Sequence, residues 1–122
     1  MAKQFLALGA MLAFVAVAAG AFGAHALKDT LGEARIDVFK TGAQYQMYHA
    51  LALLAVGLAA FRWDSGFLDA AGWLFVAGIV LFSGSLYALA ITDVKVLGAI
   101  TPLGGLCFLI GWALVAVAAL RA

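Results

Sequence analysis

The side chains that could carry out chemistry in this 122-residue chain are few, and they form short polar groups within long apolar stretches. They include both histidines, and imidazole is the side chain whose charge ordinarily changes near neutral pH. Polar and titratable groups inside apolar helices are costly unless they are paired, so they mark candidate functional sites. The candidates are His25, Gln44, Tyr45, Tyr48, His49, Ser83, Ser85, Tyr87 and Thr101.

These residue types favour hydrogen bonding and binding over catalysis. No carboxylate lies in the interior of an apolar stretch, which argues against a proton-coupled exchanger. The chain has neither a phosphate-binding P-loop nor a zinc-protease helix motif. Two histidines with Asp93 fall short of a tetrahedral ligand set, so we predict no metal, no cofactor and no enzymatic activity. The lone Cys107 excludes an intrachain disulfide, and a net charge of +1 without a basic run gives no attraction for nucleic acid.

The elements that must position these residues are apolar helices. The chain is 67% hydrophobic with a mean hydropathy of +1.13, whereas soluble domains are about 45–50% apolar. Each membrane crossing needs about 20 apolar residues, and the runs are too long and too uniform for strands. We therefore predict an all-α fold, a single domain over residues 1–122 that forms an integral membrane bundle of four transmembrane helices. The predicted spans are residues 4–26, 43–61, 68–91 and 97–120.

The first connection, residues 27–42, has structure of its own in this prediction. Thr30 and Glu33 have the spacing of a capping box, which satisfies backbone donors at a helix start. Apolar residues follow on one side and charged residues on the other, which is typical of a short amphipathic segment lying at the interface. Gly42 is the expected bend into the next span. A helical extension of the second span with a solvated face explains the same pattern.

The direction of each span places the polar candidates on one side of the membrane. Antiparallel spans bring the first and third connections to the same face, and all the candidates lie in the half nearest that face. His49 lies about 9 Å beyond Ala43 along the second span, within the hydrocarbon. It needs a partner there, and we expect one of Tyr87, Ser83, Thr101 or His25. The cluster is compatible with hydrogen bonds that fix helix register and with a binding or proton-handling site.

Small residues are predicted to hold the helices together. Many of the 14 glycines recur at intervals of three, four or seven, which lets helix backbones approach closely. The same glycines could serve an interface between copies of the chain. Pro102, followed by Gly104 and Gly105, predicts an irregularity near the start of the last span. It is either a flexible helix start or a bend that opens a cavity.

Four motifs in order carry a resemblance to a known family: GAFGAH at residues 20–25, YQMYHAL at 45–51, LFSGSLY at 81–87 and ITPLGG at 100–105. With them the chain resembles the YgdD/YwdK-like family of small bacterial inner-membrane proteins, which has relatives among animal transmembrane proteins. The resemblance implies a multi-pass protein of the bacterial inner membrane. It implies no reaction, because the family's domain is one of unknown function.

The function that we expect is that of a non-enzymatic membrane module whose polar cluster binds a lipid or a small amphiphile. The expected partners are membrane lipid and a second copy of the chain in a homo-oligomer, with no nucleic acid. Two alternatives use the same residues: a small channel or transporter with a titratable histidine, and a structural or assembly partner in the membrane.

Overall fold

The computed structural model describes residues 1–122, which are helical almost throughout and contain no strand. The all-α prediction is therefore confirmed. Helices α1 and α2 are joined by a π-helical segment, and so are α3 and α4, while a 3-10 turn precedes α5. The elements are α1 (Ala2–Val17), η1 (Ala18–Gly23), α2 (Ala24–Ala60), α3 (Gly66–Gly78), η2 (Ile79–Ser83), α4 (Gly84–Thr92), η3 (Lys95–Ala99) and α5 (Thr101–Arg121).

The number of long apolar helices differs from the prediction of four. Three helical stretches are long and apolar enough to cross a membrane: Ala2–Ala60, Gly66–Thr92 and Lys95–Arg121. The first has 59 residues because no loop interrupts it. Its one non-helical residue is Gly32, with φ 79° and ψ 169°. That conformation is essentially restricted to glycine, so the chain reverses direction there without a loop.

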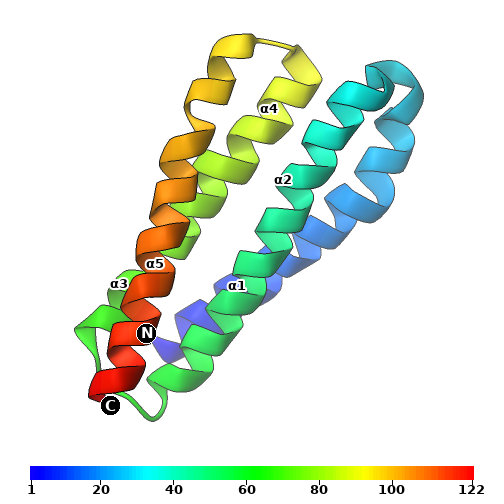
Figure 1. The fold of residues 1–122 in the computed structure, drawn as a ribbon. Helices are drawn as coiled ribbons and strands as arrows, with labels where there is room; N and C mark the ends of the chain where they lie inside the picture. Colours follow the sequence, from blue (N-terminus) through cyan, green and yellow to red (C-terminus); the bar gives the residue numbers. More distant parts are fainter.

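The reversal at Gly32 makes residues 2–31 and 33–60 lie side by side, as Figure 1 shows for the blue and the cyan-to-green segments. The Gln46 side chain donates to the Leu12 carbonyl oxygen across this pair. A second hairpin is formed by α3, η2 and α4 against α5, with its reversal at Asp93. Both reversals lie at one end of the bundle and both chain termini at the other (Figure 1).

The separate amphipathic segment predicted for residues 27–42 is absent. After the reversal at Gly32, helix α2 runs without a break to Ala60, so residues 33–42 are the first turns of that leg, as the alternative interpretation had it. The predicted capping box is wrong, since neither Thr30 nor Glu33 makes a side-chain hydrogen bond. The predicted bend at Gly42 is also wrong, because this buried glycine faces the Tyr87 ring within a regular helix.

Within each hairpin, glycines bring helix backbones into contact. A Cβ atom at Gly9 would lie 2.9 Å from the Ala50 carbonyl oxygen, and one at Gly104 would collide with the backbone nitrogen of Phe82. Small residues allow this approach, which gains dispersion energy where lipid supplies no hydrophobic force between helices. The glycine packing expected from the sequence is thus present inside each hairpin.

The irregularity predicted at Pro102, Gly104 and Gly105 is also wrong. Helix α5 is continuous from Thr101, and Pro102 sits in its first turn, where its missing N–H would have no helical partner in any case. The irregular segments are instead the two π-helical ones, η1 and η2. The sequence analysis did not predict them.

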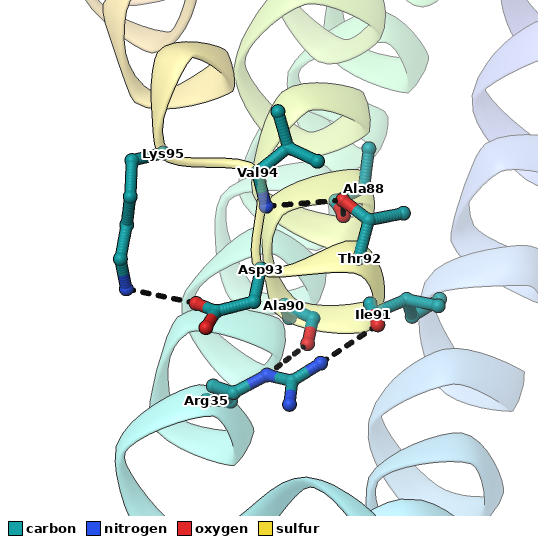
Figure 2. A network of polar contacts seen from close by, with 8 residues as sticks. All are labelled: Arg35, Ala88, Ala90, Ile91, Thr92, Asp93, Val94 and Lys95. Carbon is teal, nitrogen blue, oxygen red and sulfur yellow. Dashed lines mark hydrogen bonds and ion pairs between the residues drawn. The ribbon is translucent and has the colours of Figure 1, made fainter.

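Arg35 joins the two hairpins at the reversal end of the bundle. Its Nε donates to the Ala90 carbonyl oxygen and its Nη2 to that of Ile91, both at 2.7 Å. Figure 2 shows the guanidinium of α2 placed against the last turn of α4. These carbonyls belong to the four that end a helix without partners, and a cation complements the negative end of the helix dipole. Arg35 is therefore the C-terminal cap of a neighbouring helix.

We expect Gly104→Ala to destabilise the bundle and Gly84→Ala to leave it unchanged or slightly more stable. At Gly104 the new methyl group meets backbone, which cannot move aside, whereas nothing lies within 4 Å of a Cβ at Gly84. Replacing an unobstructed helical glycine by alanine gains about 0.5–1 kcal/mol. Circular dichroism during an SDS titration of the detergent-solubilised protein measures both effects. Equal stability of the two variants would contradict the close packing of η2 and α5.

Candidate functional site

An aromatic groove lies between α2 and α5, with Phe82 of η2 also lining it. It has a volume of about 560 Å³, within the range of about 300–1,000 Å³ that is usual for ligand pockets. Apolar and aromatic side chains form most of its surface. The lining residues are Tyr45, Tyr48, His49, Phe82, Gly105, Phe108, Leu109 and Trp112.

His49 is the polar residue at the base of this aromatic groove, and it is 4% exposed. Its Nδ1 lies 2.8 Å from the Tyr45 carbonyl oxygen, which can only accept, so Nδ1 carries the proton. Its Nε2 accepts a hydrogen bond of 3.1 Å from the Trp112 indole N–H. The imidazole also stacks on the Phe108 ring at a centroid distance of 3.5 Å. Both nitrogens are thus satisfied by the neutral ring, and a second ring proton would point at the indole donor.

The partner of His49 was predicted incorrectly. None of Tyr87, Ser83, Thr101 and His25 contacts it by a hydrogen bond, because the helix opposite His49 is α5 at the level of Trp112. His25 itself is exposed and makes no side-chain hydrogen bond. The two histidines therefore do not form one site. No group of three or more His, Cys, Asp or Glu residues is close enough to hold a metal ion.

Tyr45 and Tyr48 form the wall of the groove nearest the reversal end. Their rings pack edge to face at 5.5 Å, and Tyr45 also packs on Phe82 at 4.7 Å. The Gln44 amide donates to the Tyr48 hydroxyl at 2.6 Å, so the phenolic proton stays free to donate to another group. Tyr45 and Tyr48 are 37% and 49% exposed, so the groove opens sideways on the surface of the bundle.

The other predicted residues form separate hydrogen-bonded pairs away from the groove. The Tyr87 hydroxyl donates to the Gln46 side-chain oxygen at 2.7 Å. Ser85 and Thr101 lie 2.6 Å apart, and since Ser85 already donates to the Phe82 carbonyl oxygen, Thr101 is the donor in this pair. Each pair joins two helices, as expected of interhelical hydrogen bonds that fix register. The single cluster predicted from the sequence is thus several small ones.

Ser83 belongs to none of these pairs. It is fully buried at the end of η2, and its hydroxyl has no hydrogen-bond partner. A buried hydroxyl without a partner costs free energy, so its presence is not explained by helix packing.

Sequence reasoning missed two residues that complete these contacts. Trp112 was not recognised as a polar candidate, because tryptophan is usually classed as an apolar or interfacial side chain. Its indole N–H is nevertheless a donor that needs a partner when buried. Gln46 lies within the polar run of residues 44–49, and the signal that could have identified it is its position three residues before His49, on the same helix face. It is 3% exposed and bridges Leu12 and Tyr87.

We expect Trp112→Phe to lower the free energy of unfolding by about 1 kcal/mol more than Trp73→Phe does. Both changes remove an indole from a partly exposed position, but only Trp112 donates to a buried acceptor, which would lose its partner. Far-ultraviolet circular dichroism in an SDS titration measures the difference. Equal losses would show that the bond to His49 adds nothing to stability.

The two buried serines form a second matched pair. Ser85→Ala removes two hydrogen bonds and leaves Thr101 unpaired, so we expect a loss of about 1 kcal/mol. Ser83→Ala removes a hydroxyl that has no partner, so stability should stay level or rise by a similar amount. The same unfolding titration compares them. A loss on Ser83→Ala as large as on Ser85→Ala would mean that the Ser83 hydroxyl is paired after all.

Comparison with known proteins relates this chain to bacterial proteins that are named membrane proteins. Residues 19–105 match the model of a protein family described as "Protein of unknown function (DUF423)". The chain is 51% identical over 120 residues to the UPF0382 membrane protein YwdK of Bacillus subtilis, with 98% of each chain covered. It is 49% identical to a UPF0382 membrane protein of Staphylococcus epidermidis, with 98% of this chain and 97% of the relative covered. No solved structure matches it. The resemblance to the YwdK-like proteins is confirmed, and this chain belongs to the DUF423 family of proteins of unknown function.

Proposed function

We propose that this protein is a non-enzymatic module of the bacterial inner membrane that crosses the bilayer four times and binds a lipid chain in the aromatic groove between α2 and α5. The observation that carries the proposal is the groove itself, a side-opening hollow lined by rings whose buried polar atoms are already paired.

The membrane placement is supported by where the charges lie. Four uncharged stretches, residues 4–27, 41–61, 70–92 and 96–120, each exceed the about 20 residues that one crossing needs. A straight helix of 59 residues would be about 90 Å long, far beyond the hydrocarbon thickness, whereas the reversal at Gly32 folds Ala2–Ala60 into two crossings. The relatives are named membrane proteins, which agrees with this arrangement.

The depth of the groove favours a hydrocarbon ligand. Lys40 and Arg62 are the charged residues that bound the second uncharged stretch, and α2 extends about 30 Å from Lys40 to its end at Ala60. His49 is about 13 Å below Lys40 on that scale, and Tyr45 about 7 Å. The groove therefore opens to the acyl chains of one leaflet and not to water.

The chemistry of the lining favours a chain over a polar solute. His49 and Trp112 satisfy each other, so the base of the groove offers no free donor or acceptor. Aromatic rings present flat apolar surface with little conformational entropy to lose. The same pairing weighs against a channel, because a histidine fixed by two hydrogen bonds and a stacked ring is poorly placed to pass protons.

We expect Gly105→Leu to abolish lipid adducts and Ala113→Leu to retain them. Gly105 lines the groove and meets only the Phe82 ring, at 3.9 Å, so added bulk there fills the hollow, whereas Ala113 is exposed on the same helix outside it. Native mass spectrometry of each variant, released from detergent micelles with added bacterial lipid, measures the adducts and shows whether the chain forms a homo-oligomer.

Leu109→Trp serves as a second groove-filling variant in case Gly105→Leu fails to fold, because Leu109 is exposed at the groove. Circular dichroism confirms the fold of each variant. Lipid adducts of equal abundance in all of them would overturn the proposal.

A further inference from the structure

We propose that the lipid in the groove is an anionic phospholipid of the bilayer, whose phosphate is held by the Lys40 ammonium and the Tyr48 hydroxyl, with Gln44 between them. The inference rests on the proposed function and adds to it the chemical class of the ligand and the residues that select it.

A second hollow lies between the two legs of the first hairpin, where α1 and η1 meet α2. It has a volume of about 440 Å³ and is lined by Ala16, Gly20, Lys40, Ala43 and Gln44. The hydrogen bond from Gln44 to Tyr48 joins the two hollows, because Gln44 lines this one and Tyr48 lines the groove. A ligand that spans both has its polar part beside Lys40 and its chain among the rings.

The spacing of these residues along α2 makes a continuous path. Lys40, Gln44 and Tyr48 succeed one another at intervals of four, so they lie on one face of the helix, one turn apart. Lys40 stands about 12 Å above Tyr48, at the level where the uncharged stretch of α2 begins. This is the depth of lipid headgroups, so the ammonium group meets phosphate and not acyl chain.

Lys40 is the cation at this end of the bundle that has both a free charge and a place beside a hollow. The structure's only ion pair joins Lys95 to Asp93, at 2.8 Å, which also lowers the pKa of Asp93 through the hydrogen bond and the charge of Lys95. Arg35 is occupied by the carbonyls of Ala90 and Ile91. Asp37 precedes Lys40 by one turn, but the two form no ion pair.

The donors above the groove suit a phosphate diester. The Lys40 ammonium brings three donors and a full charge, and the Tyr48 phenol keeps its proton free because its oxygen accepts from Gln44. A zwitterionic lipid also has a phosphate, but its choline would bring a second positive charge near Lys40. The arrangement therefore favours lipids whose headgroup is negative overall.

The test uses Trp112 as a reporter inside the groove. In a Trp63→Phe, Trp73→Phe background the remaining indole lines the groove, and lipids with brominated acyl chains quench its fluorescence on contact. The protein is reconstituted in vesicles that contain brominated phosphatidylglycerol or brominated phosphatidylcholine at the same fraction. We expect the anionic lipid to bind about fivefold more tightly, the size expected for one lysine near anionic lipid, and the preference to fall with added salt.

Lys40→Gln should make quenching by the two lipids equal while quenching itself persists. Lys95→Gln is the matched control, since it removes a charge at the same end that is already paired with Asp93, and it should keep the preference. The headgroup inference is overturned if Lys40→Gln keeps the preference or if the parent shows none. Quenching that Gly105→Leu fails to reduce would instead overturn the groove as the binding site.

Discussion

The structure depends on the approach of helix backbones inside each hairpin, which glycine permits. In the first hairpin Gly9 lies on Ala50, and Gly57 lies on Ala2 and Leu6; in the second, Gly104 lies on Phe82. In a membrane there is no hydrophobic force between helices, so contact area and dispersion must hold them. Each hairpin is therefore a tightly packed unit. The most extensive helix contacts are between α1 and α2 in the first hairpin and between α3 and α5 in the second.

The seam between the hairpins is built differently, from side chains. Arg35 reaches the end of α4, Tyr87 meets Gln46, and His49 meets Trp112. These long side chains bridge helices that lie farther apart than helices whose backbones touch at glycines. On the side of α4 the gap is filled, because Phe39 and Tyr87 pack with ring centroids 5.0 Å apart. On the side of α5 the rings line the gap without filling it, and the aromatic groove results.

Much of the fold was predictable because it follows from local pattern. Apolar length predicts helices, and the small-residue spacing predicts close packing. The sequence also placed His49 inside the bundle, since an imidazole at that depth needs a partner. Its partner was not predictable, because whether α4 or α5 faces His49 depends on how one hairpin rotates against the other. Hydropathy carries no information on that rotation.

The corrections have physical causes of the same kind. His25 is one of the candidates whose position in sequence suggested convergence, but η1 precedes it, and a π-helical segment shifts the face that later residues present. The reversal was assigned to the whole of residues 27–42, whereas a single glycine suffices when it adopts φ 79° and ψ 169°. The charged residues that predicted this connection belong to the helical legs on either side of Gly32.

The two hairpins have the same order of elements, a π-helical segment followed by a reversal at a residue with positive φ. Each has a π-helical segment in its first leg, η1 ending at Gly23 and η2 at Ser83, and each then reverses at a residue with positive φ, Gly32 or Asp93. Gly23 lies nine residues before Gly32, and Ser83 lies ten residues before Asp93. Each π-helical segment therefore ends about two and a half to three helical turns before its reversal. The two sides of the seam differ in how their rings pack. Phe39 and Tyr87 meet on the α4 side, whereas Tyr45, Tyr48 and His49 line a hollow with Phe108 and Trp112 on the α5 side.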